Sequence, residues 1–105
     1  MERIVIVGYQ PIPGKESELL QLISSHVPRL RQEGLVSARE PIAMQAEDGT
    51  IIEIFGWASE EAIEKAHSNS EVQKMWGEFA AVCNYIPAGS IPEMRELFSE
   101  FKPID

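Results

Sequence analysis

The chain has 105 residues, 44% of them hydrophobic, and a net charge of −8, which fits one small domain and argues against nucleic acid or an anionic membrane surface as a partner. The only cysteine, Cys83, excludes an intramolecular disulfide, and no Cys/His spacing is typical of a metal site. No segment has the apolar length of a signal-peptide core or a membrane span, so the sequence predicts a cytoplasmic protein.

The first half of the chain predicts a strand, a helix and an extended segment. Residues 3–10 carry apolar side chains on both alternating faces, which is typical of a strand covered on both sides. Apolar residues then recur every three or four positions over 15–33, which predicts a helix that ends at Gly34, with a kink or interruption at Pro28. Residues 35–46 favour a second extended segment.

The middle of the chain predicts a hairpin followed by a short helix. The dipeptide at Asp48 and Gly49 suits a tight turn. Residues 50–58 are rich in β-branched and aromatic side chains and predict a strand. Ser59 is then a suitable N-cap for a helix over 60–66.

The second half predicts a longer helix and an irregular end. Ser68 or Ser70 is expected to cap a helix that continues to about residue 84. A loop, one or two helical turns over 92–97 and a final strand over 98–104 complete the chain.

The predicted order of elements is strand, helix, strand, strand, helix, strand. This is the βαββαβ pattern of a ferredoxin-like α+β sandwich with an antiparallel sheet. Two helices cover only one face of such a sheet, while the first and third strands are apolar on both faces. We therefore expect the sheet of a second copy to cover the other face, in a homodimer.

Three stretches resemble the antibiotic biosynthesis monooxygenase family of the dimeric α/β-barrel superfamily. They are PIPGKESELLQLISSHVPRLRQEGLVSAR, IIEIFGWASEEAIEKAHSNSEVQKMW and the EDGT that precedes the second stretch. The resemblance extends over roughly residues 3–85 of a single domain over 1–105, and the extension over 86–105 carries none of the three stretches.

The resemblance implies a dimeric α/β barrel that oxidises a quinol-like or phenolic small molecule with O2, without a metal or flavin cofactor. The alternative is a dimer of the same fold that only binds a small ligand or serves a structural role. The haem-degrading branch of the family has a Trp where this chain has Trp57, but its first-strand Asn and its helix His are missing here, which disfavours that activity.

Two residues are candidates for catalysis. His67 could act as a general base, since histidine is the residue type most often used for that role, although a His at the end of a short helix also suits the terminal carbonyls. Trp57 could line a pocket for a flat aromatic substrate or could simply fill the core. We expect Cys83, on an apolar helical face, to be a buried and unreactive thiol.

Four further residues are candidates for substrate binding. Tyr9 and Tyr85 could donate to a substrate oxygen, or could be amphipathic residues at a wet boundary. Arg39 could hold an anion or form an interface salt bridge, and Trp76 could contact the substrate or belong to the core. His26 has no obvious chemical partner in the sequence around it.

Overall fold

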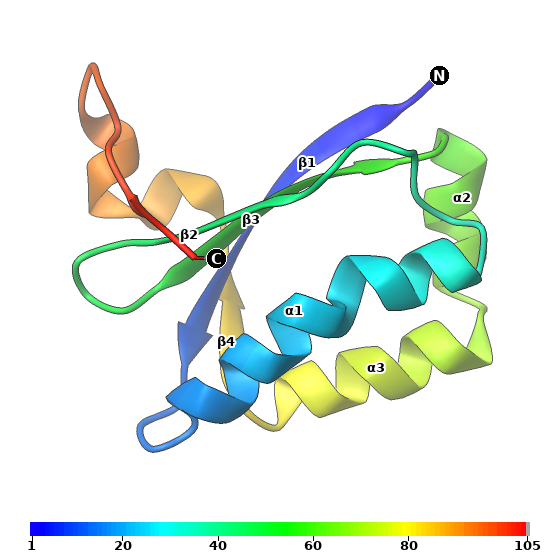
Figure 1. The fold of residues 1–105 in the computed structure, drawn as a ribbon, viewed down its shortest axis with the longest axis horizontal. Helices are drawn as coiled ribbons and strands as arrows, with labels where there is room; N and C mark the ends of the chain where they lie inside the picture. Colours follow the sequence, from blue (N-terminus) through cyan, green and yellow to red (C-terminus); the bar gives the residue numbers. More distant parts are fainter. Residues whose placement is uncertain (105) are drawn as a thin grey trace.

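The computed structural model describes residues 1–104, and Asp105, the last residue of the predicted extension, lies outside them. Figure 1 shows the path of the chain. In chain order the elements are β1 (Arg3–Pro11), α1 (Glu16–Gln32), β2 (Ile42–Gln45), β3 (Ile51–Trp57), α2 (Glu60–Ala66), α3 (Ser70–Ala80), β4 (Cys83–Ile86), the 3₁₀ turns η1 (Ala88–Ser90) and η2 (Pro92–Arg95), and β5 (Lys102–Pro103).

The strands form an antiparallel sheet in the order β4-β1-β3-β2-β5. The predicted α+β class is confirmed, and the strand order is compatible with the ferredoxin-like fold. The hairpin between β2 and β3 is also confirmed: Gly49 has a φ of +94° and Thr50 N–H donates to Asp48 Oδ1. This turn sets the register in which Ile42 lies opposite Ile54.

The prediction for the end of the second long helix was wrong. α3 stops at Ala80, and the next residues form strand β4, which pairs with β1. Gly8 of β1 permits this pairing, because a Cβ there would lie 2.7 Å from the carbonyl oxygen of Ile86. Backbone pairing with β1 thus overrides the helical periodicity that extended α3 to residue 84, and Cys83 lies on a strand rather than on a helical face.

Two predicted strands are shorter than expected. The final strand over 98–104 is reduced to β5, a fifth strand two residues long at the edge of the sheet. The extended segment over 35–46 keeps only β2 and one isolated bridge between Val36 and Trp57. Pro41, which has no N–H to give to a ladder, directly precedes β2.

Helix ends follow the local chemistry closely. α1 runs through Pro28 without interruption and ends in a Schellman motif, in which Gly34 has a φ of +72° and Leu35 N–H donates to Leu30 O. The predicted cap of α2 is confirmed, since Ser59 Oγ accepts from a backbone N–H of the first turn. The cap of α3 was misplaced by one residue: it is Asn69.

The core has two parts, one on each face of the sheet. α1 and α3 cover one face (Figure 1), where the main cluster of buried side chains lies. On the other face the segment after β4 folds back over Ile52, which is buried with Ala46 and Ile91. The segment after β4 therefore covers part of the sheet face that we expected a second copy to cover.

The rest of that face is open. The exposed fractions of Ile4, Ile6 and Ile42 are 55%, 47% and 56%. Ile6 and Ile42 both pair with Ile54, so these side chains form an apolar row across three strands. No helix within residues 1–104 combines the length and the apolar character that a membrane crossing needs.

Candidate functional site

A cavity of about 290 Å³ lies between the sheet and the two helices that cover it. Its walls come from three strands and two helices, and most of them are aromatic. Such a concave, mostly apolar site with a few polar groups is the usual form of a small-molecule site. The cavity is lined by Val5, Val7 and Tyr9 of β1, His26 of α1, Phe55 and Trp57 of β3, Trp76 of α3 and Tyr85 of β4.

A buried polar network lies at one end of this cavity. Glu53 Oε1 accepts two hydrogen bonds: one from the hydroxyl of Tyr9 at 2.8 Å and one from Nδ1–H of His26 at 2.7 Å. The exposed fractions of Glu53 and His26 are 1% and 4%. A buried carboxylate is costly unless it is paired in this way, so the three side chains hold one another in a fixed arrangement.

The strand register explains why Glu53 lies in this network. In β3 the alternate residues Ile51, Glu53 and Phe55 share the face that the helices cover, and Glu53 lies directly opposite Val7 of β1. Tyr9, two residues further along β1, is therefore its diagonal neighbour and within reach of the carboxylate. A carboxylate at the centre of an apolar sheet face is thereby brought beside its two partners.

His26 reaches the network from the apolar stripe of α1. It lies on the same helix face as Ile23 and Leu30, both of which are buried. Its ring packs edge-on against Phe55, at a centroid distance of 5.3 Å, and against Phe79, at 5.0 Å. Nδ1 is held by Glu53, and none of the hydrogen bonds described within residues 1–104 involves the other ring nitrogen, Nε2. A bound molecule that reached Nε2 could exchange a proton with the ring there.

The two tyrosines that line the cavity are not suited to act as bases at neutral pH. Burial, together with the neighbouring Glu53, raises the pKa of Tyr9 above its ordinary value. Burial also raises the pKa of Tyr85 to about 12. Both phenols therefore remain protonated at neutral pH and can donate a hydrogen bond, which leaves His26 as the base among the lining residues.

Four of the six predicted site residues line the cavity. Tyr9, Trp57, Trp76 and Tyr85 come from β1, β3, α3 and β4 and meet around one space. Tyr9 is buried rather than at a wet boundary, and its ring lies 5.5 Å from that of the half-exposed Tyr85. Tyr85 therefore lies where the cavity meets solvent.

The two other predicted residues lie elsewhere. His67 is the C-cap of α2, where its Nδ1–H donates to the carbonyl of Ile63 at 2.8 Å. Its ring also packs edge-on against Trp76, so it stands behind one wall of the cavity. Arg39 is exposed and binds Glu2 through two hydrogen bonds, which hold the pKa of Glu2 at about 2.

Sequence reasoning missed the two residues that form the buried pair. Glu53 stands alone in the apolar run IIEIF, and a charge in a buried strand requires a partner. His26 stands in the apolar stripe of a helix, between positions that face the core. Each residue was a visible exception to its local pattern, and reading the two exceptions together could have paired them.

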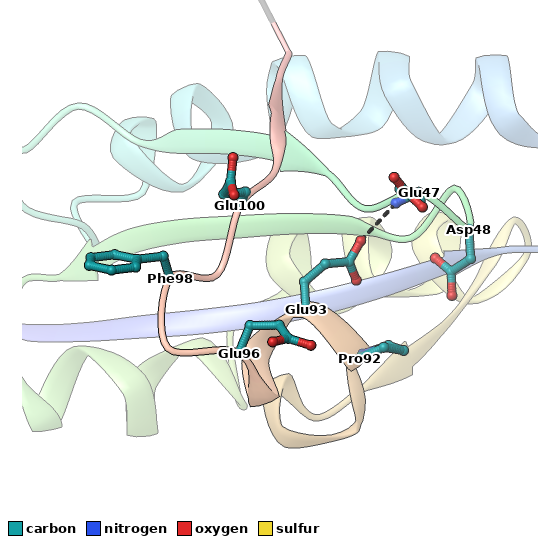
Figure 2. A pocket seen from close by; sticks show the side chains of 7 residues that line it. All are labelled: Glu47, Asp48, Pro92, Glu93, Glu96, Phe98 and Glu100. Atoms are coloured by element: carbon teal, nitrogen blue, oxygen red, sulfur yellow. Dashed lines mark hydrogen bonds between the residues drawn. The ribbon is translucent and has the colours of Figure 1, made fainter.

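A larger cavity of about 590 Å³ lies between the β2–β3 turn and the C-terminal segment (Figure 2). Glu93 closes one side by accepting a hydrogen bond from the backbone N–H of Glu47. Within residues 1–104 no three His, Cys, Asp or Glu side chains are placed to hold a metal ion. The walls of this larger cavity lack a histidine, and most of the residues that form them are acidic: Glu47, Asp48, Pro92, Glu93, Glu96, Phe98 and Glu100.

No protein-family model matches this sequence, and no curated protein matches it significantly.

Proposed function

We propose that this chain is a monooxygenase of the antibiotic biosynthesis type that oxidises a small phenolic or quinol-like molecule with O2 in the aromatic cavity. The observation that carries the proposal is the buried pair of His26 and Glu53 at the end of an otherwise apolar space. Oxidation of a phenol by O2 begins with the loss of the hydroxyl proton, because the phenolate gives up an electron far more readily. The site must therefore supply a base and an apolar enclosure.

In this proposal His26 is the general base. Nε2 takes the phenol proton, and the imidazolium that forms is stabilised by Glu53 through Nδ1–H. Glu53 is a positioning residue: it fixes the tautomer and the ring orientation of His26 without touching the substrate. The hydroxyl of Tyr9 occupies a second hydrogen-bonding site on the same carboxylate oxygen and fixes its direction.

The reaction balances without any other reagent. The phenolate transfers one electron to O2, and the resulting phenoxyl radical and superoxide combine to form a C–O bond. Cleavage of the O–O bond then releases water and leaves a quinone. One phenol with a free ring C–H thus consumes one O2 and gives one quinone and one water. The aromatic walls, with Trp57 and Trp76 among them, hold the flat ring during these steps.

Oxygen uptake by the purified, metal-free protein with a panel of phenols and hydroquinones tests the proposal, after subtraction of autoxidation. We expect uptake in proportion to protein concentration, and a loss of at least about 100-fold in His26→Gln. His67→Gln is the matched control, because His67 is outside the cavity, and it should keep its activity. Background uptake by the wild-type protein across the panel would refute the proposed activity.

We also propose that the protein acts as a homodimer through the open part of the sheet. The supporting observation is the apolar row of Ile6, Ile54 and Ile42 across three strands, in which Ile6 and Ile42 are exposed to water. A second copy placed by a two-fold axis would cover the same row on both molecules.

A further inference from the structure

We infer that the aromatic cavity encloses at most two rings of an uncharged phenol and rejects aryl carboxylates. This inference rests on the proposed function, because it assumes that the hydroxyl of the ligand faces His26. It concerns which molecules enter, and therefore differs from the question of whether they are oxidised.

The size limit follows from the volume of the cavity. A closed apolar cavity of about 150 Å³ holds one benzene ring. The cavity here has about 290 Å³, which is roughly twice that space. Its far walls are fixed, since Phe55 and Trp57 lie on the central strand β3 and are buried. A third fused ring would have to project past the half-exposed Tyr85 into water, where it gains no buried contact.

The charge limit follows from the absence of any cation in the walls. All nine Lys and Arg side chains belong to residues 1–104, and none of them lines the cavity. Arg39, the predicted anion holder, is bound to Glu2 on the surface, and Arg29 is bound to Glu78 between the two helices. The buried charged group nearest to the ligand's hydroxyl would be the carboxylate of Glu53.

A ligand carboxylate beside the phenol would therefore be buried among aromatic rings with no partner of opposite charge other than His26. His26 already donates its Nδ1–H to Glu53. The second carboxylate would face the first across one imidazole ring, an arrangement that like charges disfavour. An ester of the same shape carries no such cost.

Binding can be measured without turnover by NMR of ¹⁵N-histidine-labelled protein under anaerobic conditions. The chain has two histidines, of which His26 lines the cavity and His67 does not, so shifts confined to the ring of His26 report entry into this site. The ligands are phenol, 1-naphthol, 9-phenanthrol, 1-hydroxy-2-naphthoate and its methyl ester. In the last two the substituent is next to the hydroxyl and has to enter with it.

We expect 1-naphthol to bind about tenfold more tightly than phenol, because its second ring is buried, and 9-phenanthrol to bind within about threefold of 1-naphthol. We expect the carboxylate to bind at least about 30-fold more weakly than its ester. Tenfold tighter binding of the three-ring phenol would overturn the size limit. Equal binding of acid and ester, or equally weak binding of both, would overturn the charge limit.

The two proposals fail in different ways. If none of the five ligands shifts the ring signals of His26, the cavity is not a phenol site, and the proposed function falls together with the inference. If 1-naphthol binds but the expected order of affinities by size or by charge is reversed, the inference is wrong, while the cavity remains a site for phenols.

Discussion

Replacement of the buried pair of His26 and Glu53 by leucine, singly and together, gives a sharp test of the network. His26→Leu leaves Glu53 buried, with Tyr9 as its remaining hydrogen-bond donor. Removing the partner of a buried carboxylate costs about 3–5 kcal/mol, because the charge keeps the penalty of its burial. Glu53 is 1% exposed, so its carboxylate has almost no hydration of its own to offset the lost bond.

Glu53→Leu leaves two donors, Nδ1–H of His26 and the hydroxyl of Tyr9, without an acceptor. Each such buried group costs about 1–3 kcal/mol. In the double variant the charge and its partner are both gone, and only the Tyr9 hydroxyl is left unpaired. We therefore expect the double variant to be more stable than His26→Leu alone. It should lose about 4–8 kcal/mol less than the sum of the two single losses, because the costs of the unpaired carboxylate and of the unpaired His26 donor both disappear.

The free energy of unfolding of all four proteins is obtained from urea titrations at pH 7, followed by the fluorescence of Trp57 and Trp76, which lie close to the pair in the same cavity. Losses that add to within about 0.5 kcal/mol would show that the two side chains do not depend on each other, and the network as described would be refuted. A double variant less stable than both single variants would refute it equally.

Three other predictions concern residues outside this pair. His67→Ala should cost less than about 1 kcal/mol in urea titrations and leave oxygen uptake unchanged, because His67 only bonds the Ile63 carbonyl at an exposed helix end; a loss of uptake like that of His26→Gln would contradict this. If the proposed dimer forms, the wild type should sediment as a dimer and Ile6→Glu as a monomer at the same concentration; a monomeric wild type or a dimeric variant would rule out the apolar row as the interface. Burial raises the pKa of the Cys83 thiol from 9.0 to about 11, so the stability that the protonated thiol contributes is complete below pH 9 and is lost between pH 9 and 11. The free energy of unfolding of Cys83→Ala should therefore fall less over that pH range than that of the wild type. Equal falls in the two proteins would exclude the thiol as the cause.

Much of the fold could be predicted because its signals are local. The apolar runs of β1 and β3, the stripe of α1, the turn at Gly49 and the stop at Gly34 each depend on residues within a few positions. β4 is different, because its residues also continue the helical periodicity of α3. Only the presence of β1 beside it, with Gly8 at the point of close approach, decides that the chain is extended there.

The candidate site could be predicted only in part, for a similar reason. Trp57 and Tyr9 were candidates because of their residue types and their places at strand ends. His26 and Glu53 are 27 positions apart and meet only when α1 packs on the sheet. His67, with its polar neighbours, was the more visible histidine in the sequence. The pairing of two buried polar groups is a tertiary property that neither local pattern carries.

The lengths of the two outermost strands limit how copies of this chain can associate. At one edge of the sheet β5 has two residues, of which Pro103 has no N–H, and at the other edge β4 has four residues and is followed at once by Pro87. Neither outermost strand offers a long row of free backbone groups to which another strand could add. Residues 3–7 of β1 are different, because they pair with β3 on one side and with no strand of residues 1–104 on the other, so a strand added from outside the chain would meet the sheet there.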